Sequence, residues 1–314
     1  MDLFGAVEGG GSKFICAVAR RPDPATILET VRFETRDAHQ TLADVVAFFR
    51  SAESRHQGTL SGLGIASFGP IELDRSRPNF GSVLSTPKPG WQSVPVVRIL
   101  ADALSLPIDR IGWETDVNAA ALGESRWGAG QGADPLVYIT VGTGIGGGCI
   151  INGHPLHGLL HPEIGHILLP PIRLPNGTLD PFPGFGCPFH DRCWEAMASG
   201  PALAARLGRS ASDVGDDDPV WEIEAEYIAL GLATCVLIIS PRRIVIGGGV
   251  IEGRAETLLP KIRRHLSRSL NGYIDRPEIQ DQRDDYVVAA ALRTSSPAIA
   301  GALLLAARHP NQHS

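Results

Sequence analysis

The chain has 314 residues and a formal net charge of −6, and 20% of its residues are charged. Because its Lys and Arg residues are scattered rather than clustered, the sequence lacks the basic patch that nucleic acid or an anionic membrane would attract. Its start, "MDLFGAVEGGGSKF", has no basic segment followed by a long apolar one, and no apolar run reaches membrane-spanning length. We therefore expect a cytoplasmic protein with no nucleic-acid partner and no membrane contact.

The number and placement of the cysteines indicate thiols or a metal rather than disulfides. Five cysteines in a chain of this length do not make a disulfide framework, and an odd number in a reducing compartment is typical of free thiols or metal ligands. Cys16, Cys149 and Cys235 lie in apolar runs, so we expect them in the core. Cys187 and Cys193 lie instead in a stretch rich in Gly and Pro.

The first part of the chain predicts alternating strands and helices. Apolar runs at residues 3–8 and 13–20, on either side of "GGGS", predict a strand hairpin at the start of the chain. The elements expected after it are a helix over residues 40–54, a buried strand over 60–70, a helix over 94–104, a strand over 111–116 and an Ala-rich helix over 117–130.

The pattern begins again with a strand, a glycine turn and a strand over residues 135–153, much like the first hairpin. Because 314 residues exceed the size at which one hydrophobic core usually stops growing, two lobes with related openings are the simplest account. The later elements expected are a helix over 193–207, a helix over 220–240, a strand over 242–252 and a closing helix over 296–309. The acidic run 216–218, followed by Pro219, indicates a solvated helix cap rather than a metal site.

Three glycine clusters come directly after predicted strands. They are residues 9–11 beside Ser12, residues 142–148 around Thr143, and residues 247–249. Glycine lets backbone N–H groups approach an anion closely, and a neighbouring hydroxyl adds a donor, so such turns suit phosphates. One cluster alone would indicate a tight turn, but three of them favour nucleotide binding. None has the spacing of a P-loop or of a strand-to-helix dinucleotide motif, so both of those folds are disfavoured.

Two acidic residues beside these elements suggest a phosphoryl-transfer site. Asp116 ends a predicted strand immediately before a helix, which is where an open α/β sheet exposes residues to its cleft. It is either the general base for a substrate hydroxyl or the N-cap of the helix, and the sequence favours neither. Glu8, one residue before the first glycine turn, is a candidate for positioning Mg2+ through water.

The stretch "HPEIGHILLPPIRLPNGTLDPFPGFGCPFHDRCWE", residues 161–195, predicts a metal centre. Cys187, His190 and Cys193 have C-x-x-H-x-x-C spacing, and His166 lies upstream, which completes a set of two nitrogen and two sulfur ligands. That set suits zinc in a closed, structural site. The alternatives for the fourth ligand are His157 and His161.

These motifs resemble the ROK sugar kinases, and within them the bacterial fructokinases. "EGGGSKF" looks like the first phosphate loop of the family, "GTGIGGG" is similar to its second, and "IVIGGGV" resembles the segment beside the adenosine. "ETDVNAAALGE" looks like the segment that carries the catalytic aspartate, and "HPEIGH" resembles the sugar-contacting E-x-G-H element. The resemblance extends from near residue 3 to the closing helix.

Three features resemble the fructokinase branch rather than glucokinases or sugar-responsive repressors, which usually have a C-x-C-G-x-x-G-C zinc loop. They are "CPFHDRC", "STPKPGW" and Thr115 in place of Asn before the aspartate. The resemblance implies phosphorylation of D-fructose by ATP at the terminal hydroxyl, with Mg2+ and Zn2+ as cofactors and a homodimer as the assembly. It also implies a two-lobed α/β fold, actin-like and ribonuclease-H-like, with an interlobe cleft. The lobes would be residues 1–116, joined by a helix over 295–310, and residues 117–294.

The resemblance further implies roles for individual residues. Asp116 would deprotonate the 6-hydroxyl of the sugar. The other residues that would contact the sugar are Gly69, Thr86, Glu163, His166 and Glu195. Those that would approach the nucleotide are Gly10, Gly11, Ser12, Lys13, Thr143, Gly144, Gly247 and Gly248. His166 would face zinc with one ring nitrogen and the sugar with the other. Glu8 and Ser12 stand where many members of the family have Asp and Thr.

Two other functions remain open. One is a kinase of the same family that acts on glucose, mannose or an N-acetylhexosamine. The other is a noncatalytic sugar-binding or sugar-sensing protein, against which the retained Asp116 argues. A DNA-binding repressor is disfavoured, because only seven residues precede Glu8 and the sequence has no basic patch.

Overall fold

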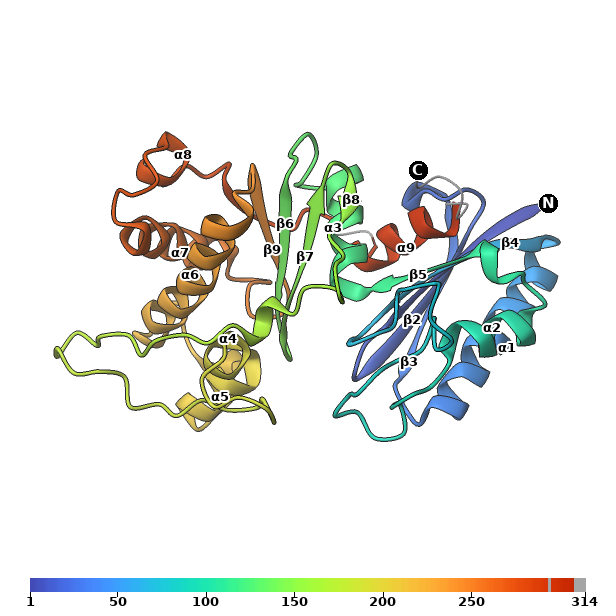
Figure 1. Ribbon diagram of the computed structural model, residues 1–314, viewed down its shortest axis with the longest axis horizontal. Coiled ribbons are helices and arrows are strands. Elements are labelled where there is room, and N and C mark those ends of the chain that lie inside the picture. Colours follow the sequence, from blue (N-terminus) through green and yellow to red (C-terminus); the bar gives the residue numbers. More distant parts are fainter. Residues whose placement is uncertain (293–294, 308–314) are drawn as a thin grey trace. The chain divides into compact units, whose positions relative to one another are not determined.

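The computed structural model describes residues 1–292 and 295–307, which form two compact units (Figure 1). The first unit comprises Met1–Gly128, Pro155–His161 and the described residues from Leu292 onward. The second comprises Ala129–His154 and Pro162–Ala291. Each unit contains one five-stranded sheet with helices packed against it. The chain is therefore an α/β protein built from two similar halves.

The first sheet has the strand order β3-β2-β1-β4-β5. Its strands are β1 (Asp2–Gly9), β2 (Lys13–Ala19), β3 (Ile27–Glu34), β4 (Thr59–Ser67) and β5 (Ile111–Thr115). Strands β1 to β3 are antiparallel neighbours, whereas β4 runs parallel to β1 and β5 parallel to β4. The predicted hairpin and the two later strands are confirmed, and β3 is an additional edge strand.

The second sheet repeats this plan, with the order β10-β9-β6-β7-β8. Its strands are β6 (Leu136–Val141), β7 (Ile145–Ile151), β8 (His154–Pro155), β9 (Arg243–Gly247) and β10 (Val287–Ala289). Here β6 and β7 form the antiparallel hairpin, β9 is parallel to β6, and β10 is parallel to β9. The two related openings expected from the sequence are thus confirmed as equivalent hairpins of two sheets.

The helices were mostly expected from apolar spacing. Those of the first unit are α1 (Ala38–His56), α2 (Val96–Leu104), α3 (Asp116–Trp127) and α9 (Pro297–Ala307). Those of the second are α4 (Trp194–Ala198), α5 (Gly200–Leu207), α6 (Val220–Ile239), α7 (Ala255–Leu270) and α8 (Pro277–Gln280). Residues 308–310 of the expected closing helix lie outside the described residues. Across the described part of the chain, no helix has both the length and the apolar character needed to cross a membrane.

One face of β4 packs into the apolar core of the first unit. Successive residues of a strand point to opposite faces, so alternate residues of β4 lie on this face. Leu63 and Ile65 belong to the apolar core that includes Phe49 of α1 and Leu100 of α2. Cys16 lies in the same core, as expected. Cys149 and Cys235 of the second unit are likewise buried.

Helix α9 lies directly on the backbone of its neighbours. A Cβ added to Gly64 of β4 would be 1.7 Å from Ala302 O, and one added to Gly301 would be 1.8 Å from Ala119 O. Neither distance is possible for real atoms, so these positions require glycine. This contact explains why α3 and α9 are rich in Ala and Gly: small side chains allow the two helices to touch.

The same contact determines where the first unit ends. The expected lobe ended at residue 116, whereas the unit defined by contacts continues to Gly128. The difference arises because α3 packs against α9 and β4. Helix α3, which begins at Asp116, therefore belongs to the first unit.

The prediction of one helix over residues 193–207 is wrong, since two helices are present. Ser199 has extended backbone angles, φ −77° and ψ 163°, so the helix is interrupted there. Its hydroxyl accepts a hydrogen bond from the Ala202 N–H at 3.3 Å, which caps the second helix. Pro201 follows in the first turn of α5, where the missing N–H of proline costs nothing.

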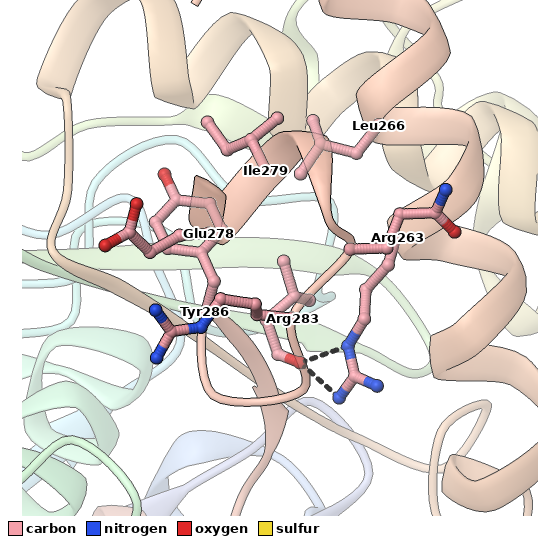
Figure 2. A pocket seen from close by; sticks show the side chains of 8 residues that line it. Arg263, Leu266, Glu278, Ile279, Arg283 and Tyr286 are labelled. Atoms are coloured by element: carbon pink, nitrogen blue, oxygen red, sulfur yellow. Dashed lines mark hydrogen bonds between the residues drawn. The ribbon is translucent and has the colours of Figure 1, made fainter. Parts of the chain in front are cut away.

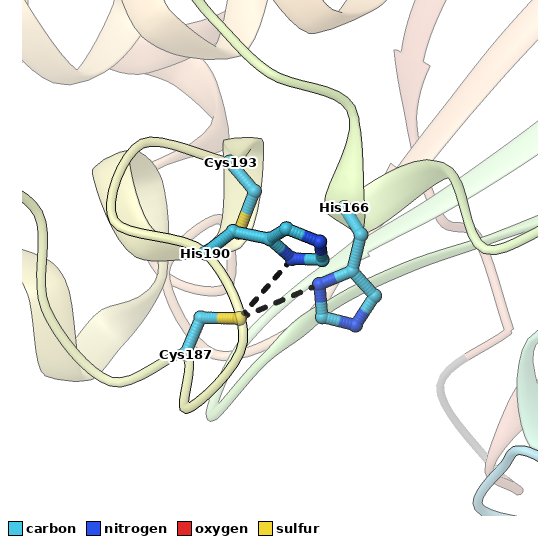
Figure 3. A group of neighbouring side chains, drawn as sticks. All are labelled: His166, Cys187, His190 and Cys193. Carbon is cyan, nitrogen blue, oxygen red and sulfur yellow. Dashed lines mark hydrogen bonds between the residues drawn. The ribbon is translucent and has the colours of Figure 1, made fainter.

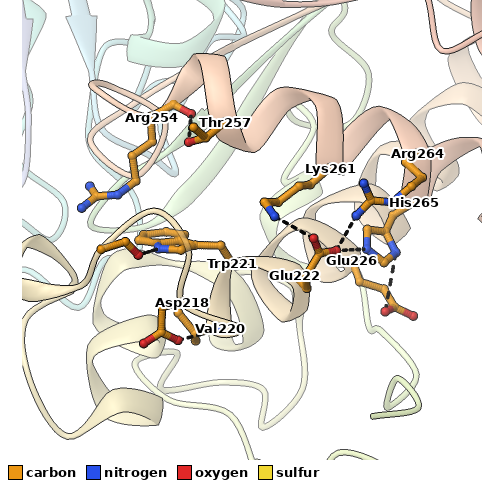
Figure 4. A network of polar contacts seen from close by, with 11 residues as sticks. Asp218, Val220, Trp221, Glu222, Glu226, Arg254, Thr257, Lys261, Arg264 and His265 are labelled. Atoms are coloured by element: carbon orange, nitrogen blue, oxygen red, sulfur yellow. Dashed lines mark hydrogen bonds and ion pairs between the residues drawn. The ribbon is translucent and has the colours of Figure 1, made fainter. Parts of the chain in front are cut away.

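Helices α6 and α7 lie side by side and are joined by an ion-pair network (Figure 4). Glu222 accepts hydrogen bonds from Lys261 at 2.7 Å and Arg264 at 2.5 Å and contacts His265 at 3.1 Å. Burial opposes ionisation of this carboxyl, but the hydrogen bonds from these three residues outweigh it and lower the pKa of Glu222 to about 2. The N-cap of α6 is Pro219 rather than a residue of the acidic run, but the Asp218 carboxylate before it accepts the N–H of Val220, the first residue of the helix, at 2.9 Å.

Replacing Gly301 with Ala is expected to lower the free energy of unfolding by about 1–3 kcal/mol, which is typical of overpacking. The added methyl group would overlap Ala119 O, and this outweighs the roughly 1 kcal/mol by which Ala favours a helix over Gly. Urea denaturation measures the difference. Gly215→Ala is the matched control, because its Cβ would meet no atom within 4 Å. A Gly301→Ala protein as stable as wild type would contradict the proposed contact.

Candidate active site and metal centre

The carboxyl ends of three parallel strands meet at one edge of the first sheet. The first glycine turn follows β1, Gly69 follows β4, and Asp116 follows β5. The Phe68 N–H donates to Gly9 O at 2.8 Å, so the residues before Gly69 lie beside the start of the turn. Open α/β sheets bind ligands outside these strand ends.

The first glycine turn is held by short contacts from its own unit. The Gly10 N–H donates to Lys13 O at 2.8 Å and closes the turn. Thr35 directly follows β3, and its hydroxyl donates to Gly10 O at 2.7 Å. Gly11 and Ser12 are exposed at its tip. The turn therefore presents backbone to solvent while its base is fixed.

A second loop of the first unit reaches this turn through Lys88, a residue that the sequence analysis did not single out. The Lys88 ammonium donates to Gly11 O at 2.5 Å, and the Lys88 N–H donates to the Thr86 hydroxyl at 3.3 Å. Lys88 thus links the loop of Thr86 to the glycine turn. The signal available in the sequence was a cation within "STPKPGW".

Asp116 is the first residue of α3 but not its cap. The N-cap is Thr115, whose hydroxyl accepts the Asn118 N–H at 3.2 Å, so the alternative of a capping role for Asp116 is wrong. The Asp116 carboxylate accepts the Val117 N–H at 2.9 Å. A half-buried carboxylate is therefore present at the strand ends, on the first turn of a helix that packs against α9 and β4.

Glu8 lies within the first sheet beside its glycine turn. Burial raises the pKa of its carboxyl, whereas a hydrogen bond with Ser296 and the positive charge of Lys13 act in the opposite direction. The Oε2 atom is buried and has no hydrogen-bond partner among the described residues. A buried carboxylate oxygen of this kind fits a hydrated divalent cation, which prefers one or two carboxylates in addition to phosphate oxygens.

Two glycine turns lie side by side in the second unit. The residues concerned are Gly142, Thr143 and Gly144 after β6, and Gly247 and Gly248 at the end of β9. Gly248 has a φ of +94°, and a Cβ there would be 2.4 Å from Val141 O. The Val250 N–H donates to the same carbonyl at 3.0 Å. Residues 146–148 of the expected cluster are strand residues of β7 rather than part of the turn.

Glu195 joins the turn after β6 to the E-x-G-H element. Its Oε2 atom accepts the Ile145 N–H at 3.0 Å. Gly165 lies against the same residue, since a Cβ there would be 1.8 Å from Ile145 O. Burial raises the pKa of Glu163 to about 7, and the neighbouring Glu195 carboxylate adds to this effect. The second unit therefore brings Glu163, Glu195 and the glycine turn together.

Four side chains of the second unit form a group suited to a metal ion (Figure 3). They are His166, Cys187, His190 and Cys193, whose ligand atoms all lie within 4.8 Å of one another. Cys187 Sγ is 3.6 Å from His166 Nδ1 and 3.7 Å from His190 Nδ1. A sulfur and a nitrogen bound tetrahedrally to one Zn2+ would be about 3.6 Å apart, given the usual bond lengths. The residues therefore fit zinc.

The chain brings His166 to Cys193 through a short pairing of two segments. The Trp194 N–H donates to Ile167 O at 2.8 Å, and the Leu169 N–H donates to Arg192 O at 3.0 Å. The alternatives for the fourth ligand, His157 and His161, are wrong. Both belong to the first unit, where each has a different partner.

A buried ion pair fastens the long loop between these two segments. Asp180 accepts two hydrogen bonds from the Arg206 guanidinium at 2.9 Å and one from the Tyr227 hydroxyl at 2.7 Å. Burial would raise the pKa of Asp180, but these donors hold it below its ordinary value. The sequence did not reveal this clamp, because its three residues lie far apart along the chain.

A separate small pocket lies among α7, α8 and β10 (Figure 2). Its cationic residues already have protein partners. The Arg263 guanidinium donates to Val287 O at 2.7 Å, and Arg283 pairs with Asp285 at 2.6 Å. We assign this pocket no role in the site.

The arrangement agrees with known proteins. The model of the ROK family matches residues 4–309. The chain belongs to the ROK family. A fructokinase of Zymomonas mobilis subsp. mobilis is 39% identical to this ROK protein over 280 residues, covering 88% of this chain and 89% of that one. A fructokinase of Streptococcus mutans serotype c is 38% identical over 304 residues, which is 97% of each chain.

Solved structures of the family have the same fold. A ROK family glucokinase from Streptomyces griseus, solved in complex with glucose and AMPPNP, superposes with a TM-score of 0.73. It is 29% identical to this ROK protein, covering 96% of this chain and 98% of that one. The two-lobed α/β fold implied by the motifs is therefore confirmed.

Asp180→Asn is expected to lower the free energy of unfolding at pH 7 by about 3 kcal/mol, because it leaves the buried Arg206 charge without its partner. A carboxyl whose folded pKa is depressed contributes stability above its unfolded pKa and loses it as the pH falls through the folded pKa. The difference between wild type and variant should therefore narrow as the pH falls from 7 toward 3, as measured by denaturant titrations.

The control is Asp102→Asn, whose pair with Arg98 is 68% and 67% exposed on the two side chains. Exposed pairs contribute about 0–1 kcal/mol, so little change is expected at either pH. A difference between Asp180→Asn and wild type that stayed constant with pH would contradict the charge-based explanation.

Proposed function

We propose that this ROK protein is an ATP-dependent fructokinase that converts D-fructose to fructose 6-phosphate. The observation that carries the proposal is that fructokinases 38–39% identical align with nearly the whole chain, whereas the glucokinase of known structure is 29% identical. "CPFHDRC" and "STPKPGW" support the same choice of sugar. A homodimeric assembly and a cytoplasmic location stay predictions.

Asp116 is the proposed general base. It is a half-buried carboxylate on the first turn of α3, and α3 is anchored by its contact with α9. Phosphoryl transfer needs a residue that orients the attacking hydroxyl and accepts its proton. Asp116 would take the proton of the fructose 6-hydroxyl while that oxygen attacks the terminal phosphorus of ATP.

Five residues besides Asp116 are the proposed sugar contacts. In the second unit they are Glu163, His166 and Glu195, and in the first they are Gly69 and Thr86. The Glu195 carboxylate lies close enough to raise the pKa of Glu163, which supports a polar pocket for several hydroxyl groups. His166 turns Nδ1 to the metal group, so Nε2 remains on the other side of the ring for a sugar hydroxyl.

The proposed nucleotide contacts are made by the glycine turns. They are Gly10, Gly11, Ser12 and Lys13, together with Thr143, Gly144, Gly247 and Gly248. Glu8 would hold Mg2+ through water, and its buried Oε2 atom supports this role. When bound, Mg2+ would neutralise charge on the phosphates.

Zinc is proposed as a structural ion held by the four-residue group around Cys187. Burial raises the pKa of Cys193 to about 11, so a bound cation would be needed to favour the thiolate. Two of the proposed sugar-binding residues are tied to this group, because His166 is one of its members and Glu195 follows Cys193 by two residues. Zinc would thereby hold sugar-binding residues in place.

Purified protein supplied with ATP and Mg2+ should form fructose 6-phosphate and should prefer fructose over glucose, mannose and N-acetylhexosamines in kcat/KM. Asp116→Asn should lower kcat by about 10²–10⁴-fold, the usual contribution of a general base, while ATP still binds. A coupled assay with a panel of sugars measures both.

Asp109→Asn is the matched control, since Asp109 is an exposed acid shortly before β5. Preference for another hexose would overturn the choice of fructose but not the kinase. Sugar binding without turnover would favour a noncatalytic sugar-binding protein. Near wild-type activity of Asp116→Asn would remove Asp116 from the role of base.

Wild-type protein should contain about one zinc per chain, and Cys187→Ser or Cys193→Ser should remove most of it. Because the metal group closes the loop onto α4, loss of zinc should lower Tm by about 5–10 °C. Elemental analysis and thermal denaturation test this. Cys149→Ala is the control, as a buried cysteine outside the group. Freshly purified wild type without zinc would refute the proposal.

A further inference from the structure

A short segment of the first unit, Pro155–His161, lies in the chain between two stretches of the second unit. Two histidines attach it to the first unit. His161 Nε2 accepts the Ile71 N–H at 3.1 Å in a buried position. His157 Nε2 is 2.8 Å from Glu114 Oε2. The segment is therefore bound at Ile71 and at Glu114. Glu114 lies two residues before Asp116 in the sequence.

Glu114 connects this segment to the start of α3. It is the penultimate residue of β5 and is only 3% exposed. Its Oε1 atom accepts the Thr115 N–H at 2.8 Å and the Asn118 side-chain amide at 2.9 Å. Its Oε2 atom faces His157. The carboxylate thus holds the residue before Asp116 and a residue of the first helical turn.

We propose that Glu114 and His157 form a positioning pair that fixes the direction of the Asp116 carboxylate. The proposal rests on the proposed function, in which Asp116 is the base. The pair would not contact the reacting atoms; it would act through Thr115 and Asn118, which lie on either side of Asp116 in the sequence. His157, on a segment distant in sequence from β5, thereby becomes a determinant of the rate of phosphoryl transfer.

Contact with His157 would stabilise the buried Glu114 carboxylate in the position from which it holds Thr115 and Asn118. An ionised carboxylate removed from water is costly unless it has a charged or hydrogen-bonded partner. Burial would lower the pKa of His157, but the hydrogen bond and the charge of Glu114 outweigh this and raise it.

Loss of His157 would leave the Glu114 carboxylate without its ionic partner, so its bonds to Thr115 and Asn118 would rearrange. The Asp116 carboxylate would shift with them, because it accepts the N–H of the next residue in the same turn. Displacement of a catalytic group by about 1 Å is enough to cost about 10²-fold in rate. The sugar and the nucleotide should still bind, since neither partner of the pair is among the proposed contacts.

The test compares His157→Phe, which keeps a ring but has no donor, with His157→Gln, whose amide can take the place of Nε2. His157→Phe should lower kcat by about 10–100-fold and change KM for fructose and ATP less than threefold. His157→Gln should recover a large part of kcat. In an Asp116→Asn background, His157→Phe should have almost no further effect on the residual rate, because the base it positions is gone.

His56→Phe is the matched control, since it breaks another His–Glu pair of the first unit, 3.3 Å from His56 Nε2 to Glu29 Oε2. It should leave kcat unchanged. A second readout needs no activity: amide hydrogen exchange over residues 112–118 should be faster in His157→Phe than in wild type or His56→Phe.

The outcomes separate the pair from the function on which it rests. Unchanged kcat and unchanged exchange in His157→Phe would overturn the pair. Equal loss of kcat in His157→Phe and His157→Gln with a raised KM would also overturn it, because the side chain would then act on substrate binding. Wild-type protein that phosphorylates no sugar would defeat the proposed function, and the exchange measurement would still decide whether the pair orders the start of α3.

Discussion

The direct backbone contact of α9 with α3 and β4 is the constraint on which the first unit depends. Gly301 lies against Ala119 O and Gly64 against Ala302 O, so no side chain separates the elements. Such contact leaves little room for α3 to tilt. Asp116 is the first residue of α3, and Ser296, just before α9, reaches Glu8. One packing arrangement therefore positions both acidic residues assigned to phosphoryl transfer.

In the second unit, two of the three proposed sugar-binding residues, Glu163 and His166, lie in a long segment with little regular structure, and the third, Glu195, lies in the short helix α4. The stretch between β8 and α4 has only a single turn of 3-10 helix, so few ladder hydrogen bonds hold it. Local devices replace them: the group of two histidines and two cysteines, the Asp180 clamp, and Gly165 packed on Ile145 O. The group of histidines and cysteines would thus hold in place a segment that has little regular structure of its own.

Much of the fold could be predicted, because its signals are local. Both hairpins follow from apolar runs around glycine turns, and the metal group follows from the spacing of Cys187, His190 and Cys193. The prediction of the helices failed where local signals for continuing and for ending a helix lay close together. Ala-rich sequence favoured one helix over 193–207, but the hydroxyl of Ser199 and the ring of Pro201 begin a new helix inside it. The edge strand β3, with one face exposed, also lacked a strong apolar signal.

The sequence by itself determined the strand hairpins, the glycine turns, the close spacing of Cys187, His190 and Cys193, and the position of Asp116 directly after a strand. These features depend on neighbouring residues, whose spacing sets their geometry. Only the tertiary structure decided that Lys88 reaches Gly11, that Asp180 pairs with Arg206, and that His157 pairs with Glu114. Such contacts join residues 26 to 77 positions apart, and packing of whole elements, rather than any local preference, brings them within hydrogen-bonding distance.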